Sequence, residues 1–460
     1  MPKEQDRDDD DAAQQQSAVK KKVHFFSIDS ELVYWNFFLD FGPLNLGQLY
    51  NFCKKLNNKI QDPRYRNRVI CFYSNTTFAK RANAMYLLAA WQVLYARRTP
   101  EEAIAPFKRA VFYEDIVSQS KLHSPRSVVT KMGGTLDAIP PFHDASPCDC
   151  SYDLNILDCL RGLSKARAHN FFNFDNFDID EYEHFEQVEV SSINCTYLNA
   201  QEGFHIFISC GKNLTIFFDP KNGDLNWIAQ GKFLAFAGPQ FEKKVTREGC
   251  YTLTPEHYAP YFKSKNVGLV CRLNKRMYDE NVFKKFGIDH YEHYYLDGSC
   301  PSMPILNKIL QAFEAVPADK GIAVHCKAGL GRTGTCIGAY IMKHYKFTAR
   351  EVIGWMRICR PGMVIGPQQH FLEDIQERMW RDGDLMNARV SRGVSSKRSG
   401  RRTVESLSGI KDLSVDQQRS KDLPADEDLL GEEYDPNSEA VRGRAGQADA
   451  LLSSRRNKFR

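Results

Sequence analysis

A cysteine and an arginine six positions apart, Cys326 and Arg332, lie in a glycine-rich turn that could carry out chemistry. The preceding residues, Ile322 to His325, are typical of a short buried strand, and those that follow are typical of an apolar helix. A strand, a tight turn and a helix N-terminus form an anion cradle, because backbone N–H groups converge where the helix dipole is positive. Gly329 and Gly331 are expected where side chains would block the anion.

The same cradle would activate the cysteine. The helix dipole and the guanidinium of Arg332 should lower the pKa of the Cys326 thiol, so that a thiolate is available near neutral pH. Arg332 offers a planar fork that matches two phosphoryl oxygens, and Thr333 can hydrogen-bond the thiolate. This set suits hydrolysis of a phosphate monoester through a cysteinyl-phosphate. The simpler interpretation, a buried core cysteine, fits a lone Cys better than it fits this whole string.

Two further segments supply groups that such a reaction needs. Asp297 lies in an Asp-Gly turn after an expected strand, and an aspartic acid on a loop can protonate the departing oxygen. Gln368 and Gln369 begin a helix expected to reach Trp380, where either amide could orient the water that cleaves the intermediate. The simpler interpretations are an ordinary turn for Asp297 and N-terminal capping of the helix for the glutamines.

The elements around these residues predict an α/β fold. From about residue 223, strands alternate with helices and end at the strand before Cys326, which argues for a mostly parallel sheet covered by helices. Ligands in such sheets bind at the carboxyl ends of the strands, where Cys326 falls. The strand at 68–73 and the helix at 81–95 have the same order, but their turn lacks the cysteine and the glycines. The first half would then be a non-catalytic copy.

Composition and pattern divide the 460 residues into two domains and several flanking segments. Two stretches without a clear period are expected to be poorly ordered insertions or products of an unremoved intron, and the polar termini are expected to be disordered. The predicted segments are a disordered arm at 1–22, a non-catalytic domain at 23–190 with an insertion at 111–139, an insertion or linker at 191–222, a catalytic domain at 223–382, and a disordered tail at 383–460.

Bulk properties narrow the class of protein. The net charge of +5 is mild and gives no argument for nucleic-acid binding. The 13 cysteines lack framework-like spacing, and Cys148 and Cys150 are too close for a metal knuckle, so a reducing cytosolic or nuclear setting is expected. The acidic start is unlike a signal peptide, and no apolar run is long enough to span a membrane.

The string from His325 to Thr333 resembles the Cys-x₅-Arg signature of protein tyrosine and dual-specificity phosphatases. Other segments resemble the cell division cycle fourteen phosphatase family, and together they cover most of 23–382. These segments are 23–28, 98–102, 180–184, 223–227, 272–276 and 357–362. The resemblance implies two tandem dual-specificity-phosphatase-like domains, mostly parallel central sheets flanked by helices, and catalysis in the second domain only.

The resemblance also assigns roles to residues. It implies Cys326 as nucleophile, Arg332 as phosphate-binding residue and Asp297 as general acid, with no metal and no cofactor. The implied phosphate cradle is formed by Lys327, Ala328, Gly329, Leu330, Gly331 and Thr333. The acidic run at 178–189 has a solvated surface as its common interpretation. The resemblance favours a groove wall for a basic substrate residue, including Glu181, Glu183 and Glu186.

The implied substrates are phosphoserine, phosphothreonine and phosphotyrosine proteins, with preference for phosphoserine-proline followed by a basic residue. The implied partners are substrates of cyclin-dependent kinases, opposed during mitotic exit. The implied location is the nucleus, including the nucleolus, and the cytoplasm, with association with the centrosome or spindle. The basic segment 397–402 could direct nuclear import or bind a regulator through the tail.

Two other classes of function compete with this one. A phosphoinositide phosphatase has a similar cradle, but a second lysine helps it to bind inositol phosphates, and this chain has Leu330 there. The acidic run would also repel a polyanion. A non-enzymatic phosphoprotein-binding scaffold would usually have lost Cys326, Arg332 or Asp297, and all three are present.

Overall fold

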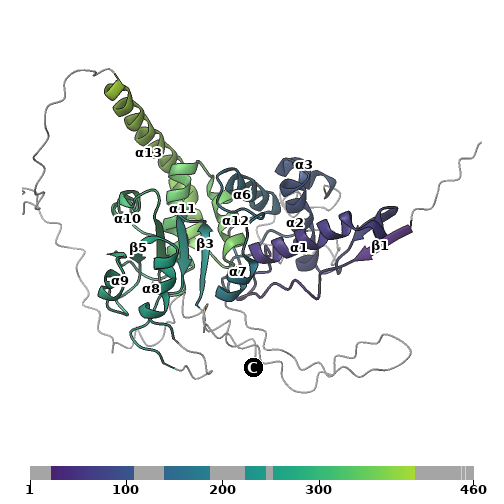
Figure 1. Ribbon diagram of the computed structural model, residues 1–460, viewed down its shortest axis with the longest axis horizontal. Coiled ribbons are helices and arrows are strands. Elements are labelled where there is room, and N and C mark those ends of the chain that lie inside the picture. The colour runs from purple at the N-terminus through teal and green to yellow at the C-terminus, as the bar shows by residue number, and fades with distance from the viewer. Residues whose placement is uncertain are drawn as a thin grey trace, which may run out of the picture.

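The computed structural model describes residues 22–107, 139–186, 223–244 and 252–398, together with Gln447 and Leu451. Side chains of the last helix are described as far as residue 388. The predicted insertions at 111–139 and 191–222 and the predicted N-terminal arm lie almost wholly outside these residues, as does most of the predicted tail. The described chain forms two halves, at the right and the left of Figure 1.

The first half combines a small parallel sheet with helices. Strands β1 (Lys22–Phe26) and β2 (Arg68–Phe72) pair in parallel, as expected for a strand–helix–strand unit. Between them, α1 (Leu46–Gln61) buries apolar residues three and four positions apart, and Asn45 and Gln48 form a capping box at its start. The remaining elements are η1 (Pro63–Tyr65), α2 (Phe78–Leu94), α3 (Pro100–Ile104), η2 (Ala105–Phe107), α6 (Ile156–Ala168) and α7 (Ile179–Phe185).

The second half contains a five-stranded sheet in the order β3-β4-β7-β5-β6. Only the edge strand β3 is antiparallel to its neighbour, so the prediction of a mostly parallel sheet is confirmed. The strands are β3 (Leu225–Ala229), β4 (Phe233–Phe236), β5 (Val267–Arg272), β6 (Asp289–Glu292) and β7 (Gly321–His325). All five residues of β7 are buried, because this central strand has a neighbour on each side and helices on both faces.

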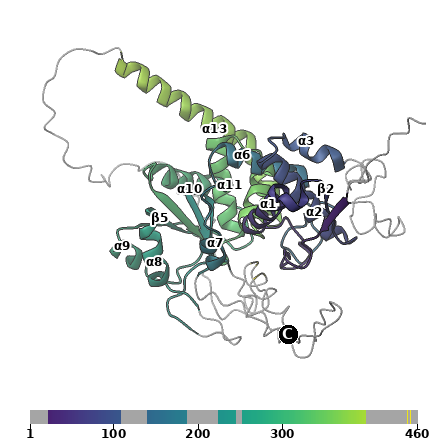
Figure 2. The same cartoon turned by 45° about the vertical axis from the view of Figure 1, so that its right-hand side comes forward.

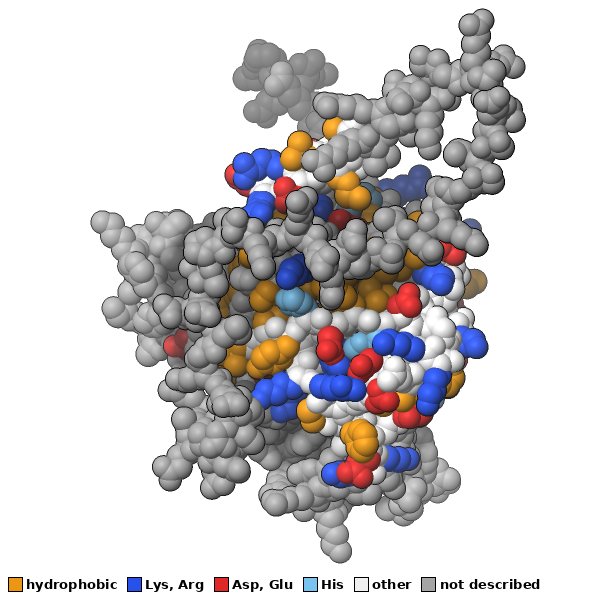
Figure 3. Space-filling view, turned by 90° about the vertical axis from the view of Figure 1, so that its left-hand side faces the viewer, with side chains coloured by type: hydrophobic (Ala, Val, Ile, Leu, Met, Phe, Trp, Pro, Cys, Tyr) orange, Lys and Arg blue, Asp and Glu red, His pale blue; other side chains and the backbone are white. Residues whose placement is uncertain are grey.

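Helices cover this sheet and connect it to the first half (Figure 1). They are α8 (Pro255–Ser264), α9 (Asn281–Lys285), α10 (Met303–Ala315), α11 (Gly331–Tyr345), α12 (Ala349–Cys359) and α13 (Pro367–Arg398). On the face of the second half that Figure 3 shows, Lys and Arg side chains are interspersed with Asp and Glu. Among the described residues, no helix combines the length and the apolar composition that crossing a membrane requires.

The two halves share one hydrophobic core. Helix α6 of the first half packs on α12 of the second, and the two labels stand side by side in Figure 1. Figure 2 shows the same two halves in a turned view. The two backbones approach closely, because a Cβ at Gly162 would lie 2.2 Å from the carbonyl oxygen of Glu351, and one at Gly354 would lie 2.9 Å from Cα of Cys159. The cluster of buried side chains runs from Phe26 through this contact into the second sheet. The halves are therefore packed as one body.

The last helix differs from the prediction. It was expected to end near Trp380, with a disordered tail from 383, but α13 continues to Arg398. Gly383 is not a helix stop. A Cβ there would lie 2.0 Å from the carbonyl oxygen of Lys343, so this glycine allows α13 to cross close to α11. Next to it, Lys346 bonds the carbonyl oxygen of Trp380 at 2.6 Å, a contact that secures the crossing.

Candidate active site

Cys326 lies at the carboxyl end of the central strand. It follows β7 directly, and α11 begins at Gly331, so the loop between them is five residues long. The cysteine side chain is buried, with 2% of its surface exposed. This is the strand–turn–helix arrangement predicted from the sequence, and it directs the positive end of the α11 dipole at the loop.

The carbonyl groups of residues 326 to 329 are each bonded by a donor outside the loop. His325 Nδ1 binds the first and the amide of Gly238 binds the second, at 2.9 and 3.0 Å. The guanidinium of Arg360 binds the other two through Nη2 and Nε, both at 3.0 Å. Because successive carbonyls are held on the outer side, the N–H groups of the loop are left for its concave side. Such a ring of N–H groups binds an oxyanion.

Arg360 is itself held by the strand that begins the second half. Its Nη1 donates to Asp224 Oδ1 at 2.6 Å and to Asn226 Oδ1 at 2.8 Å, and all three residues are buried. The segments that contain these residues resemble the family, but nothing in their sequence predicted a role for Arg360, Asp224 or Asn226. Their function in the structure is to fix the back of the cradle.

Close packing against neighbouring atoms explains why glycine occupies positions 329 and 331. Gly329 has φ of +69°, and a Cβ there would lie 2.1 Å from the carbonyl oxygen of Phe236 on the neighbouring strand. A Cβ at Gly331 would lie 2.6 Å from Oε1 of Gln368. Close approach to β4 and to Gln368 therefore demands these glycines, and the expectation that side chains would block the anion is wrong for Gly329.

A buried chain of hydrogen bonds orients His325. Its Nδ1 faces the Cys326 carbonyl and must donate, and its Nε2 lies 2.7 Å from the hydroxyl of Tyr278, which also contacts His290 Nε2 at 2.9 Å. Burial lowers the pKa of His325 to about 3 and that of His290 to about 4. Both rings are therefore neutral near pH 7, and His325 acts as a fixed donor to the cradle.

Arg332 is buried with only 3% of its side chain exposed. Its Nη1 donates to the carbonyl oxygens of Tyr295 and Leu273, at 2.9 and 3.3 Å. Nη2 forms an ion pair with Asp297 at 3.1 Å. Nε has no hydrogen-bond partner among the described residues. The guanidinium is thus fixed in place with one buried donor uncommitted, which suits an anionic ligand.

Asp297 lies in the loop after β6, as predicted. Its side chain is 22% exposed and contacts Arg332 through Oδ1. The structure therefore brings the predicted acid to the predicted phosphate-binding arginine. The hydroxyl of Thr333, which was expected to bond the sulfur, is buried without a hydrogen-bond partner among the described residues. That expected bond to the thiolate is absent from this arrangement.

The two glutamines have different surroundings, although the sequence did not distinguish them. Gln369 has its amide committed, because Nε2 donates to Asp144 Oδ2 at 2.8 Å and Oε1 accepts a short hydrogen bond from Arg357. Gln368 lies over Gly331, with its Nε2 donating to the carbonyl oxygen of Ser299 at 3.2 Å and its Oε1 accepting from the amide of Ile365 at 3.3 Å. Gln368 is therefore the glutamine that faces the cradle.

The acidic residues of α7 lie where the two halves meet, because the helix contacts both α1 and β3. Glu181 forms an ion pair with Lys265 at 2.7 Å and accepts from the hydroxyl of Tyr261, and it lines a pocket of about 240 Å³. Glu183 is exposed, and Glu186 is half-buried. Glu183 accepts a hydrogen bond from Asn51 of α1, and Glu186 accepts one from Asn45 at the cap of α1; both donors are neutral amides. Lys265 therefore neutralises Glu181, whereas Glu183 keeps its charge near the surface.

Near the mouth of the cradle lies a residue from the C-terminal part of the chain. A Cβ at Gly331 would be 3.0 Å from Oε1 of Gln447, and one at Gly298 would be 3.4 Å from its Cβ. Leu451 is buried in the core cluster. This contact could not be predicted from the sequence, because nothing local marks a residue this far along the chain as a neighbour of the cradle.

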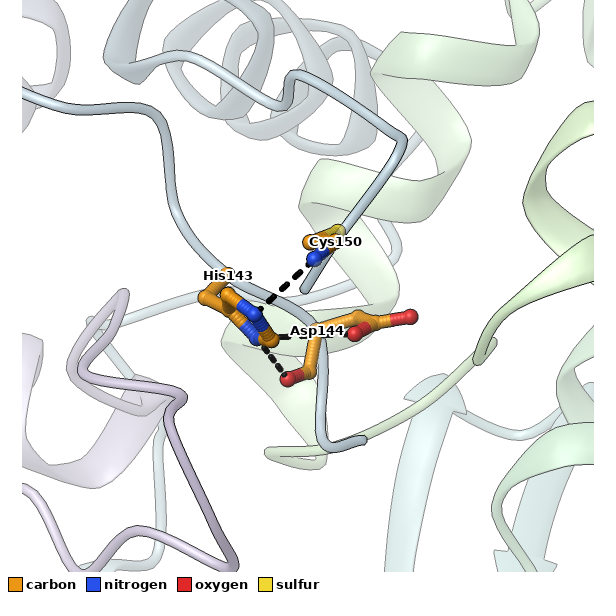
Figure 4. Close-up of side chains that lie close together, drawn as sticks. All are labelled: His143, Asp144 and Cys150. Atoms are coloured by element: carbon orange, nitrogen blue, oxygen red, sulfur yellow. Dashed lines mark hydrogen bonds and ion pairs between the residues drawn. The ribbon is translucent and has the colours of Figure 1, made fainter. Parts of the chain in front are cut away.

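A group of metal-ligand types lies close by in the first half, formed by His143, Asp144 and Cys150 (Figure 4). Nδ1 of His143 is 2.6 Å from the carbonyl oxygen of Asp144, and Nε2 accepts from the amide of Cys150 at 3.1 Å. The thiol of Cys150 donates a hydrogen bond to the carbonyl oxygen of Tyr152. Both ring nitrogens are thus engaged with the backbone, so the arrangement is that of a hydrogen-bonded turn and does not fit a metal ion.

The chain is similar in sequence to known protein phosphatases. Residues 11–123 match the family described as dual specificity protein phosphatase, N-terminal half, and residues 259–378 match dual specificity phosphatase, catalytic domain. Dual specificity protein phosphatase CDC14A of Mus musculus is 40% identical to this chain, over 95% of this chain and 62% of that protein. CDC14A of Homo sapiens is 43% identical, over 87% of this chain and 57% of that protein. CDC14C of Homo sapiens is 37% identical over 94% of this chain and 85% of that protein. The chain thus spans about three-fifths of the length of the CDC14A relatives.

Proposed function

The chain belongs to the dual specificity protein phosphatases named CDC14, and from this premise we propose that it hydrolyses phosphoserine, phosphothreonine and phosphotyrosine in proteins. The observation that carries the proposal is the cradle itself. Cys326 lies in a loop whose carbonyls are all bonded from outside, beside a buried Arg332 with an uncommitted Nε. This arrangement binds a dianion next to a nucleophile.

The first step forms the cysteinyl-phosphate. The thiolate of Cys326 attacks phosphorus as the phosphorus–oxygen ester bond breaks, and the departing oxygen takes the proton of Asp297. The loop N–H groups and Arg332 hold the non-bridging oxygens, so the charge of the transferred group is balanced throughout the transfer. No metal is needed for this step, because the guanidinium and the helix dipole supply the positive field.

The second step returns the enzyme to its starting state. Water attacks phosphorus, the phosphorus–sulfur bond breaks with its electron pair returning to the sulfur of Cys326, and the carboxylate of Asp297 takes the proton of the water. Gln368 is the amide that lies over the cradle, so we assign the water-orienting role to it. Gln369 instead holds the turn in place.

For the substrate, we propose phosphoserine-proline sites with a basic residue downstream, of the kind that cyclin-dependent kinases produce. Glu183 supports this preference, because it is exposed and its hydrogen bond comes from a neutral amide. Glu181 contributes less, because Lys265 already balances its charge. A role in opposing these kinases during cell division, in the nucleus and cytoplasm, rests on the family resemblance alone. Loss of phosphosite removal in cells that express only Cys326→Ser would support it.

The test is hydrolysis of paired phosphopeptides by the full chain. One peptide carries phosphoserine-proline with a lysine three residues after the phosphoserine, and the other has alanine there. We expect faster cleavage of the lysine peptide, abolished by Cys326→Ser and retained by Cys71→Ser, a matched change at a half-buried cysteine of β2. The preference should shrink in Glu183→Gln. Equal cleavage of both peptides by the wild type would remove the groove assignment and leave the mechanism.

Two results would instead favour the competing classes. Binding of the phosphopeptides by a folded wild type, without any release of phosphate, would indicate a scaffold. Preferential release of phosphate from phosphoinositide vesicles would indicate a lipid phosphatase. Against the second class stands Leu330, which is buried with 4% of its surface exposed, so it offers neither charge nor reach to an inositol phosphate.

A further inference from the structure

A residue of the first half contacts the turn that carries the glutamines. Asp144 is buried with 2% of its surface exposed. Its Oδ2 accepts from the amide of Gly366 at 2.7 Å and from Nε2 of Gln369 at 2.8 Å, across more than 220 positions of sequence. Its Oδ1 accepts from the hydroxyl of Ser146 at 2.5 Å. Both carboxylate oxygens are therefore directed by hydrogen bonds.

The turn at 362–366, between α12 and α13, has three residues with positive φ, a conformation that needs support from neighbouring residues. Gly362 and Gly366 have φ of +83° and +58°, and Val364 has φ of +61°. A β-branched residue rarely adopts the left-handed region, so the surrounding structure must impose this conformation. The bonds to Asp144 are part of that support.

Arg357 supports the same turn from the opposite side. Its Nε and Nη2 donate to the carbonyl oxygens of Met363 and Val364, at 3.2 and 3.1 Å, and Nη2 also donates to Oε1 of Gln369. The amide of Gln369 thus connects the buried guanidinium to the buried carboxylate of Asp144. A buried carboxylate is stable only with such partners, so these three residues form one unit.

We propose that Asp144 is a positioning residue for the second step, acting through the turn to hold Gln368 over the cradle. The proposal rests on the proposed function, because it concerns hydrolysis of the cysteinyl-phosphate. Gln368 follows the turn directly, and its Oε1 accepts from the amide of Ile365 within it. A displaced turn therefore displaces the amide that orients the attacking water. The first step uses Cys326, Arg332 and Asp297, and the guanidinium of Arg332 is held by Leu273, Tyr295 and Asp297, outside this turn.

The test separates the two steps with a chromogenic aryl phosphate. Rapid mixing measures the burst of phenolate that accompanies formation of the cysteinyl-phosphate, and the steady state measures its hydrolysis. For Asp144→Ala we expect a burst rate within a factor of about two of the wild-type rate. Hydrolysis of the cysteinyl-phosphate should be about 10-fold to 100-fold slower, because misplacing a catalytic group by about 1 Å can lower a rate by that much. Acid quenching should trap more phosphoenzyme in the variant than in the wild type.

Further variants distinguish positioning from a general loss of structure. Asp144→Asn should restore hydrolysis, because an amide oxygen can accept both bonds from the turn and its NH₂ can donate to Ser146. Gln369→Leu, which removes the same clamp from the other side, should reproduce the slow second step even where Asp144→Ala folds poorly. Asp158→Ala is the matched control, since it removes another buried carboxylate of the first half that contacts the second half, through Arg350 at 3.6 Å. It should leave the ratio of the two steps unchanged.

A double-mutant cycle sharpens the assignment. If Asp144 acts through Gln368, Asp144→Ala combined with Gln368→Ala should slow hydrolysis little more than Gln368→Ala alone. Equal slowing of both steps in Asp144→Ala, unchanged hydrolysis in a folded Asp144→Ala, or the same partition in Asp158→Ala would each overturn the proposal. Absence of any trapped phosphoenzyme in the wild type, under conditions where substrate is consumed, would instead overturn the proposed function, and this inference with it.

Discussion

Arg360 is the residue whose replacement most directly tests how the cradle is held open. It makes two hydrogen bonds to the carbonyls of Ala328 and Gly329 and two to the side chains of Asp224 and Asn226. Arg360→Met would leave the carboxylate of Asp224 buried without this partner, and breaking such a buried pair costs about 3–5 kcal/mol. Arg360→Lys keeps a positive charge there but loses the fork that reaches both carbonyls.

The lysine variant therefore separates stability from catalysis. Hydrogen bonds from a charged donor contribute about 1.5–3 kcal/mol each, so we expect Arg360→Lys to lose less stability than Arg360→Met. The N–H groups of its cradle should nevertheless lose their alignment toward the phosphate. Loss of a single oxyanion donor lowers kcat about 10²-fold to 10³-fold. Urea unfolding measures the first effect, and kcat/KM for an aryl phosphate together with the Ki of inorganic phosphate measures the second.

A matched change completes this experiment. Asp224→Asn removes the charge partner of Arg360 but leaves the fork free to hold both cradle carbonyls, so it should lower stability with a much smaller loss of kcat/KM. The reasoning is refuted if a folded Arg360→Lys variant has the same Ki for inorganic phosphate and the same kcat/KM as the wild type. It is also refuted if Asp224→Asn loses as much activity as Arg360→Lys, because carbonyl anchoring would then not be the cause.

Three further predictions concern the shared core, the pH and the C-terminal part of the chain. Gly162→Ala should destabilise the whole chain by about 3 kcal/mol in urea unfolding, since the new Cβ overlaps the carbonyl oxygen of Glu351; an unchanged midpoint would contradict close packing of the halves. The pKa of His325 is about 3 in the folded state and near 6.5 when unfolded, so the unfolded chain takes up the proton first as pH falls. Stability should therefore decline below about pH 6.5, by about 2 kcal/mol from this group at pH 5, and a urea midpoint that stays level between pH 7 and pH 5 would refute this. Inorganic phosphate should bind several-fold more tightly to Gln447→Ala in calorimetry, because the amide no longer takes space above Gly331; equal affinity would show that Gln447 does not compete.

The sequence predicted those parts of the fold and site whose causes are local. Apolar spacing located the strand at 68–73 and the helix at 81–95 within a few positions of β2 and α2, and the strand–turn–helix around Cys326 follows from residues that adjoin in the chain. The local pattern left Asp297 open between a turn and a general acid, and the family resemblance implied the acid; the structure places this residue 3.1 Å from Arg332. These predictions needed no knowledge of what packs against what.

Predictions that depended on distant contacts were wrong or were not made. Gly329 was assigned to the anion, but the reason for it is the carbonyl of Phe236, on a strand about 90 positions earlier. The last helix was expected to end near Trp380, but α13 continues past Gly383, where the glycine lets it cross close to Lys343. In each case a glycine permits a close approach, and the sequence shows the glycine without showing what approaches it.

The same limit explains why the first half looked dispensable for catalysis. Its turn lacks a cysteine and a cradle, so the sequence alone suggests a non-catalytic copy, and the resemblance adds only the acidic groove wall. The structure gives it two direct contributions: α6 packs on α12 without a gap, and Asp144 bonds the turn that carries Gln368 and Gln369. Its described strands form a two-stranded sheet, and its buried side chains belong to the same core cluster as those of the second half. The second half by itself would therefore lack both the helix α6 that covers α12 and the Asp144 bonds that support its water-orienting turn.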